Sequence, residues 1–270
     1  MRKGRLKLWA IAVLMATSSA AQASDATVNR GAYALNAEQI GTGPVTVVFE
    51  SGFGQGKDVW KEVIAALGAG YRSITYSRAG LGKSSSDGKP KDIDAHLVDL
   101  GAVIDNLASG QKVVLVGHSY GGLLATEFAR RHAEQLRALV LVDPATMSQR
   151  HAFKQADSTR ILADDAALLG MLPPSMADDY RLLIAQLDAP GAQAPRAMPD
   201  LAVTLLTATQ VADKPFVFEE TATGKALWKA QHAALFSSFN RGTHRYFVTG
   251  HNIHREKPAA VAEMIKEIAN

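Results

Sequence analysis

The chain has 270 residues and the composition of an ordinary soluble globular protein. Hydrophobic residues make up 47% and charged residues 20%, which excludes a disordered, collagen-like or multi-span membrane protein. Lys and Arg (29) outnumber Asp and Glu (26), for a formal net charge of +3. The sequence contains no cysteine, which excludes disulfides, thiolate metal sites, a cysteine nucleophile and a lipid-modified cysteine.

The first 23 residues have the pattern of a secretory signal peptide. Four Lys and Arg residues stand between positions 2 and 7, an apolar run covers 8–16, and Ala21-Gln22-Ala23 fits the motif before a cleavage site. The apolar run is shorter than the roughly 20 residues of a membrane-spanning helix, so we expect cleavage after Ala23 and no membrane anchor. Cleavage removes four cations and no acid, leaving 25 against 26 charges, a net of −1. We therefore expect a secreted or periplasmic protein and no nucleic-acid partner.

Strand and helix patterns alternate along the rest of the chain and predict a parallel sheet covered by helices on both faces. The predicted strands are 45–50, 72–76, 112–116, 137–142, 201–206 and 244–248. The predicted helices are 92–108, 120–132, 225–239 and 258–268. Between about 145 and 199 no strand pattern occurs, so we expect a helical cap insert there. Residues 24–270 are expected to form one α/β domain that includes this cap.

One short motif points to chemistry. Gly117-His118-Ser119-Tyr120-Gly121 is a G-x-S-x-G motif between a predicted buried strand and a predicted helix. The turn from strand to helix is so sharp that the serine adopts a strained backbone conformation, and its neighbours two residues away must lack bulk. The serine oxygen then lies at the helix N-terminus, where the helix dipole favours negative charge. The sequence therefore predicts Ser119 as a nucleophile.

This motif resembles the nucleophile elbow of the α/β-hydrolase superfamily, of the AB hydrolase-1 type of serine hydrolase. Two further segments resemble loops of the same family: 49–54, the turn that supplies part of the oxyanion hole, and 76–84, the Y-D-x-x-G-x-G-x-S loop. Glu50-Ser51 replaces the usual apolar–His pair, which we interpret as a subgroup feature, and Ser77 replaces the usual Asp. The resemblance implies the α/β-hydrolase fold. It also implies an oxyanion hole made of the backbone N–H groups of Phe53 and Tyr120.

A serine nucleophile needs a general base, and the sequence offers eight histidines. The resemblance places the base at His251, in Gly250-His251-Asn252-Ile253-His254 after the last predicted strand, with His254 as the second candidate. The side chain of His118 should point away from that of Ser119. Three others are expected on or near polar helix faces, exposed to solvent: His96, His132 and His151. The His251–His254 pair lacks the Glu and Cys of zinc motifs, so we expect no metal.

The acid that orients the histidine has two candidates. Most relatives carry it after the strand that is 201–206 in this sequence, where Asp213 lies. Other relatives carry it at the end of the preceding strand, where Leu141-Val142-Asp143-Pro144 fits. The V-D-P sequence also occurs in members that use the later acid, so Asp213 stays open. We favour Asp143.

The resemblance implies two-step acyl transfer without a cofactor, most typically by a carboxylesterase-like enzyme that cleaves an ester. Epoxide hydrolases and haloalkane dehalogenases of this fold use Asp as nucleophile, so a serine argues against them. A thioesterase, a lactonase, an aminopeptidase, a cofactor-free haloperoxidase-like enzyme and a non-catalytic ligand-binding homologue remain alternatives. The expected partner is a small-molecule acyl substrate. Seven apolar cap residues either line its pocket or attach the cap to the core: Leu168, Leu169, Met171, Leu172, Leu182, Leu183 and Ile184.

Overall fold

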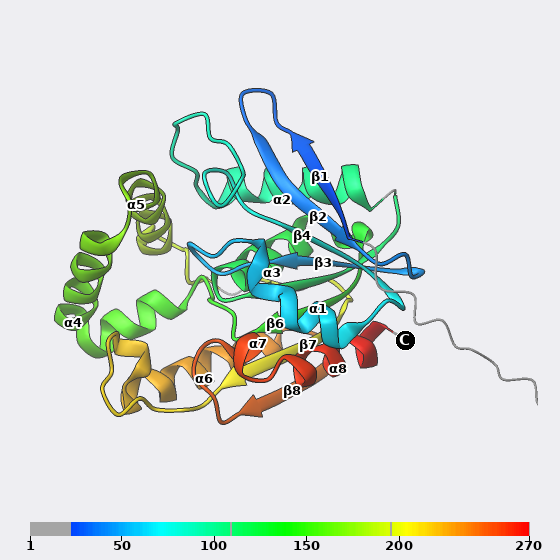
Figure 1. Cartoon of the computed structure of the whole chain (residues 1–270). Helices are drawn as coiled ribbons and strands as arrows, with labels where there is room; N and C mark the ends of the chain where they lie inside the picture. Colours follow the sequence, from blue (N-terminus) through cyan, green and yellow to red (C-terminus); the bar gives the residue numbers. More distant parts are fainter. Residues whose placement is uncertain (1–22, 109, 195, 270) are drawn as a thin grey trace, which may run out of the picture.

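The computed structural model describes residues 23–108, 110–194 and 196–269 (Figure 1). The predicted signal peptide therefore lies outside these ranges except for Ala23, which begins the first strand, β1. Among the described residues, no helix has both the length and the apolar character needed to cross a membrane.

An eight-stranded mixed sheet forms the centre of the fold, in the order β1-β2-β4-β3-β5-β6-β7-β8. The strands β1 and β2 are antiparallel to their neighbours, and the remaining strands run parallel to one another. The strand bounds are β1 (Ala23–Asn29), β2 (Ala34–Ile40), β3 (Val45–Glu50), β4 (Tyr71–Tyr76), β5 (Val113–His118), β6 (Leu136–Val142), β7 (Ala202–Ala208) and β8 (Arg241–Phe247). All six predicted strands are present, and the β1–β2 hairpin is an addition.

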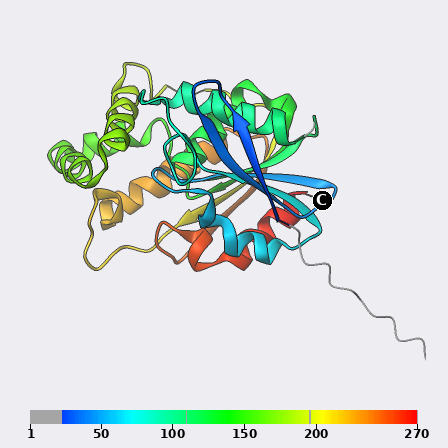
Figure 2. The same ribbon diagram turned by 45° about the horizontal axis from the view of Figure 1, so that its top comes forward.

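Helices cover both faces of the sheet, as predicted (Figure 2). One face carries α2 (Ile93–Leu107), α3 (Tyr120–Arg131) and the end of α6 (Ala222–Ser237), and the other carries α1 (Lys61–Leu67) and α8 (Pro258–Ala269). The shorter helices are η1 (Lys57–Trp60), η2 (Ala133–Gln135), η3 (Phe218–Glu220) and α7 (Ile253–Glu256). Strand β5 shows why both faces need cover: alternate side chains enter opposite cores, and every one is buried.

The insert between β6 and β7 is helical and consists of α4 (Gln149–Met171) and α5 (Pro174–Asp188). Asp157, with φ −156° and ψ 83°, breaks α4 into two segments. The two helices stand beyond the ends of the parallel strands rather than on a face of the sheet (Figure 1). A cap in this place covers the carboxyl ends of the parallel strands, where the loops that follow several strands converge.

Candidate active site

Ser119 occupies a strained turn between β5 and α3. Its backbone has φ 52° and ψ −121°, a region that residues other than glycine rarely adopt. A Cβ atom on Gly117 would lie 2.4 Å from the carbonyl oxygen of Gly121, and one on Gly121 would lie 2.4 Å from that of Glu50. The two glycines of the motif are therefore required by close backbone approach. The strained turn presents Ser119 at the N-terminus of α3.

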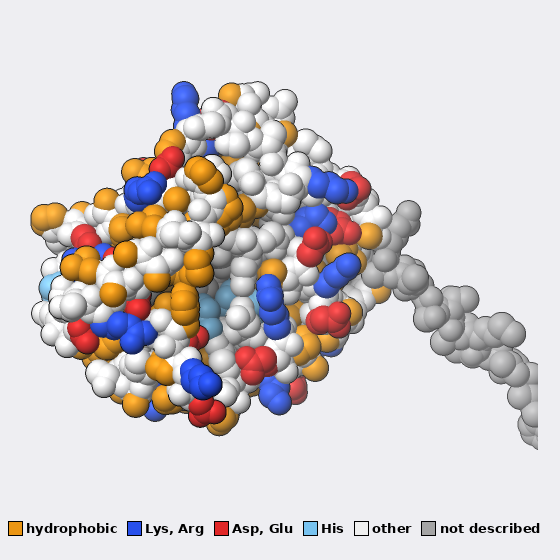
Figure 3. Space-filling view, turned by 60° about the vertical axis from the view of Figure 1, so that its left-hand side comes forward, with side chains coloured by type: hydrophobic (Ala, Val, Ile, Leu, Met, Phe, Trp, Pro, Cys, Tyr) orange, Lys and Arg blue, Asp and Glu red, His pale blue; other side chains and the backbone are white. Residues whose placement is uncertain are grey.

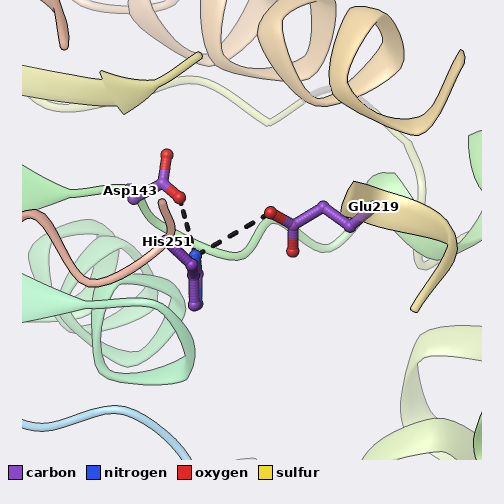
Figure 4. A group of neighbouring side chains, drawn as sticks. All are labelled: Asp143, Glu219 and His251. Carbon is purple, nitrogen blue, oxygen red and sulfur yellow. Dashed lines mark hydrogen bonds and ion pairs between the residues drawn. The ribbon is translucent and has the colours of Figure 1, made fainter. Parts of the chain in front are cut away.

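His251 and Asp143 form a hydrogen-bonded pair (Figure 4). The Nδ1 atom of His251 lies 2.6 Å from Oδ2 of Asp143, which is fully buried at the end of β6. The other carboxylate oxygen, Oδ1, accepts hydrogen bonds of 2.8 Å from the Ala208 N–H and from the Trp228 indole. Asp143 itself has a positive φ of 46°. Three donors, from β7, from α6 and from the loop after β8, thus fix this carboxylate beside the imidazole.

The surroundings shift the two pKa values in opposite directions. Burial alone raises the pKa of Asp143, but the hydrogen bond and charge of His251, helped by His232 and Trp228, bring it below its ordinary value. Burial alone lowers the pKa of His251, but the charge of Glu219 and the bond to Asp143 bring it above 6.5. Both shifts favour the pair in which Asp143 is ionised and His251 is protonated. This is the charge state that a general base reaches when it accepts a proton.

Asp213, the other predicted acid, is not placed beside His251. It is exposed in the connection between β7 and η3, whereas Asp143 is the carboxylate hydrogen-bonded to the imidazole. The same connection brings a different acid close. Glu219 of η3 lies 3.9 Å from His251 Nδ1 (Figure 4). Glu219 lies in no motif of the sequence, and only the fold of this segment brings it to the histidine.

The three groups Asp143, Glu219 and His251 are also close enough to surround an ion, since their possible ligand atoms lie within 4.8 Å of one another. However, Nδ1 of His251 is the atom that meets both carboxylates, and its 2.6 Å contact with Asp143 is the length of a charge-assisted hydrogen bond. A proton on Nδ1 therefore accounts for this cluster without an ion.

The predicted oxyanion hole lies in the turn after β3 and at the start of α3. The backbone N–H groups of Phe53 and Tyr120 donate hydrogen bonds to none of the residues that the structure describes. The rings of the two residues meet edge to face, with centroids 5.7 Å apart. An oxyanion hole requires two such donors without a partner inside the protein, so these two N–H groups are compatible with the predicted role.

A buried ion pair accounts for Glu50, which departs from the family pattern. Its carboxylate contacts the guanidinium of Arg78 and the hydroxyl of Tyr76. Arg78 also donates to the carbonyl oxygens of Ser51, at 2.6 Å, and of Gly52. These carbonyls belong to the turn that carries the Phe53 N–H. The Glu50–Arg78 pair thus holds the backbone of the predicted oxyanion turn.

The neighbouring histidines His118 and His254 do not line the cavity that contains Ser119. His118 Nε2 is 3.1 Å from the carbonyl oxygen of His251, so this side chain contacts the backbone of the His251 loop. His254, the second candidate base, is fully buried, with its ring 4.9 Å from that of Trp60 and 4.2 Å from that of His118.

One prediction about the histidines is wrong. His96, expected on an exposed helix face, is buried, and its Nδ1 lies 2.8 Å from the Tyr120 hydroxyl. Burial lowers the pKa of His96 to about 3, so the ring is neutral and accepts the hydrogen bond. The apolar spacing of α2 was correct, but the β1–β2 hairpin and the 78–91 loop cover more of this helix than the spacing indicates.

Ser119 and His251 open into one cavity of about 440 Å³. Side chains of the cap form much of its wall, and four of the seven candidate apolar cap residues line it: Leu168, Leu172, Leu183 and Ile184. Met171 and Leu182 are exposed instead. On this side of the molecule, hydrophobic side chains border a hollow in which histidines are visible (Figure 3).

Comparison with known proteins agrees with the fold. The alpha/beta hydrolase family profile matches residues 47–264. The chain belongs to the alpha/beta hydrolase family. Over 156 residues it is 28% identical to epoxide hydrolase 2 of Siraitia grosvenorii, covering 56% of this chain and 49% of that protein. Over 113 residues it is 31% identical to the mouse (lyso)-N-acylphosphatidylethanolamine lipase, covering 41% of this chain and 32% of that protein.

The match therefore spans less than half the length of each of these two relatives. Among solved structures, an epoxide hydrolase from Vigna radiata superposes with a TM-score of 0.67 at 17% identity, over 91% of this chain and 97% of that one. This likeness shows the fold alone. The family membership and the fold, predicted from the motifs, are thus confirmed.

Proposed function

We propose that the chain is a serine hydrolase that cleaves a carboxylic ester through an acyl-enzyme. The observation that carries this proposal is that the strained Ser119 turn and His251, which is hydrogen-bonded to the buried Asp143, line the same cavity. A hydroxyl, a base and an oriented acid around one cavity are the parts that nucleophilic acyl transfer needs. Secretion through the predicted signal peptide is part of the same proposal.

In the first step His251 takes the proton of the Ser119 hydroxyl, and the serine oxygen attacks the ester carbonyl carbon. The carbonyl oxygen becomes negative and accepts hydrogen bonds from the N–H groups of Phe53 and Tyr120. The alcohol then leaves with the proton from His251. In the second step His251 activates a water molecule, which releases the acid and restores Ser119. Asp143 keeps the imidazole in one tautomer and stabilises its positive charge.

The cavity indicates an apolar substrate. Its wall is mostly hydrophobic, and its charged side chains Arg150, Asp164, Asp165 and Glu219 are all in ion pairs. Arg150 binds Asp165 at 2.8 Å, Asp164 accepts from Arg160 at 2.6 Å, and Glu219 accepts from Lys225 at 2.8 Å. Groups that are already paired offer little to a charged ligand, whereas the apolar surface favours an uncharged acyl or alcohol group. The mouse relative, a lipase by name, supports an ester substrate. Epoxide hydrolases of this fold use Asp as the nucleophile, whereas this chain has Ser119 at that position, so the epoxide hydrolase relatives give less support to a shared reaction.

Hydrolysis of p-nitrophenyl esters with acyl chains of increasing length tests the proposal. We expect turnover by the wild-type protein, and a loss of kcat on the order of 10⁴ or more in Ser119→Ala. Ser158→Ala, which changes an exposed serine of the cap, is the matched control and should keep wild-type activity. If no ester, thioester, lactone or aminoacyl anilide is turned over, yet apolar ligands bind, the chain is a binding protein instead.

A further inference from the structure

Glu219 places a second carboxylate beside the histidine of the candidate site. Its Oε1 atom lies 3.9 Å from Nδ1 of His251, the same nitrogen that is 2.6 Å from Asp143 (Figure 4). The two acids come from different elements, Asp143 from the end of β6 and Glu219 from η3 after β7. A carboxylate thus approaches the histidine both from the end of β6 and from the segment after β7, the two regions in which the resemblance places the acid.

Tight packing fixes the segment that carries Glu219. The N–H of Phe218 donates a 2.6 Å hydrogen bond to Asp164 of the cap, and the Phe218 ring packs against Phe153. A Cβ atom on Gly224 would lie 1.9 Å from the Phe218 carbonyl oxygen, so η3 lies directly against the start of α6. The approach of Glu219 to His251 is therefore set by the folded core and does not depend on a free loop.

His251 belongs to a cluster of four groups that can carry charge: the His251 imidazole, the carboxylates of Asp143 and Glu219, and the ammonium of Lys225. Asp143 and Glu219 are acidic, and Lys225 of α6, which is buried, donates a 2.8 Å hydrogen bond to Glu219. The other titratable groups that face His251 are His118, His232 and His254, and burial lowers the pKa of each, so they are neutral. The group is balanced when His251 is protonated and carries one excess negative charge when His251 is neutral.

We propose that Glu219 is a second acid for His251, a positioning residue that stabilises the imidazolium and partly replaces Asp143 when Asp143 is disabled. If Glu219 served only as the ion-pair partner of Lys225, it would not need to lie close to the His251 imidazole. Glu219, however, lines the cavity of Ser119, and its side chain is 17% exposed there. The proposal rests on the proposed hydrolase function, and it adds a residue that the Ser-His-Asp pattern does not contain.

The first test is the pH profile of kcat/KM for ester hydrolysis in Glu219→Gln. Removing a negative charge about 4 Å from His251 should move the acid limb to lower pH by roughly 0.5–1 unit. Glu220→Gln is the matched control. It changes the next residue of η3, whose carboxylate accepts a 2.7 Å hydrogen bond from the Phe216 N–H and does not face His251. Equal profiles for Glu219→Gln and Glu220→Gln would overturn the proposal.

The second test adds Glu219→Gln to Asp143→Asn. If Glu219 supports the imidazolium when Asp143 cannot, the substitution should cost at least 10-fold more activity in the Asp143→Asn background than alone. Independent effects of the two substitutions would contradict the proposal.

An NMR titration of the His251 ring separates this inference from the proposed function. In Glu219→Gln the ring should titrate at lower pH than in the wild type and in Glu220→Gln, whether or not esters are cleaved. A shifted titration in a protein that hydrolyses nothing would leave the inference standing and overturn the function. An unshifted titration in an active enzyme would do the reverse.

Discussion

Trp228 donates a 2.8 Å hydrogen bond from its indole nitrogen to Oδ1 of Asp143, while His251 contacts the opposite oxygen, Oδ2. Trp228 is almost fully buried, so neither partner of this bond is free to turn toward water. The carboxylate therefore presents a fixed oxygen to the imidazole. The tautomer of His251 is set by the core of the protein.

Trp228→Phe tests this positioning role. The substitution removes the N–H donor and keeps an aromatic ring, and a hydrogen bond to a charged group contributes roughly 1.5–3 kcal/mol, so we expect kcat to fall about 10-fold or more. Steady-state kinetics on a p-nitrophenyl ester would measure the effect. Since Phe preserves much of the packing, the far-ultraviolet circular dichroism spectrum should match that of the wild type. Unchanged kcat would mean that Asp143 does not need this donor.

The identity of the acid has its own test. Asp143→Asn should lower kcat by on the order of 10⁴, as the equivalent change does in serine proteases by imposing the wrong tautomer on the histidine. Asp213→Asn is the matched control, because Asp213 is exposed away from the site, and it should leave kcat close to wild type. A large loss confined to Asp213→Asn would reverse this assignment.

The Glu50–Arg78 pair should matter for both stability and rate. Arg78→Met leaves the buried Glu50 carboxylate without its cation, which should lower the free energy of unfolding by about 3–5 kcal/mol. Glu50→Leu combined with Arg78→Met removes both charges and should recover most of that stability. It should not recover kcat, since the Ser51 and Gly52 carbonyls still lack their donor. Urea denaturation and ester kinetics on the two variants separate the effects, and recovery of kcat would contradict the positioning role.

Stability should fall in mild acid because several buried histidines stay neutral. Burial lowers the pKa of His96 and His254 to about 3 and that of His232 to about 4, against an ordinary value of 6.5. Below pH 6.5 the unfolded chain binds protons that the folded chain does not, so each such histidine lowers the free energy of unfolding by about 1.4 kcal/mol per pH unit. His251 has the opposite effect, because its pKa is raised in the folded protein. It stabilises the fold below pH 6.5, and this stabilisation is lost as the pH rises through the pKa of His251 in the folded state.

His254→Phe isolates one of these contributions. No described residue forms a hydrogen bond with either ring nitrogen of His254, so Phe removes the protonation without breaking a bond. Between pH 7.5 and 5.0 the urea unfolding free energy should fall by about 2 kcal/mol less in this variant than in the wild type. An equal pH dependence in His254→Phe and in the wild-type protein would contradict the assignment of His254.

Much of this fold follows from local sequence pattern. The central strands β3, β5 and β6 are rich in Val and Leu, because both of their faces are buried, and such runs are easily recognised. The β1–β2 hairpin was missed because residues 23–40 alternate small, polar and acidic side chains at an edge of the sheet. An edge strand that is half exposed gives no comparable signal.

The candidate site also contains residues that local sequence motifs reveal and residues that only tertiary packing brings together. Ser119 and His251 lie in motifs whose glycines and flanking elements are visible in the sequence. The choice between Asp143 and Asp213 depends on which loop returns to the histidine, and Glu219 and Arg78 reach the site through tertiary packing. Contacts of this kind leave no local pattern, because the partners are distant in the chain.

The most direct test of the central claim is covalent labelling with a fluorophosphonate, followed by mass spectrometry of the peptides. We predict rapid labelling of the wild-type protein, with the phosphonyl group on Ser119, and none of Ser119→Ala, while Ser158→Ala labels like the wild type. Absence of labelling in the wild type, or labelling that persists in Ser119→Ala, would contradict the account of Ser119 as the nucleophile.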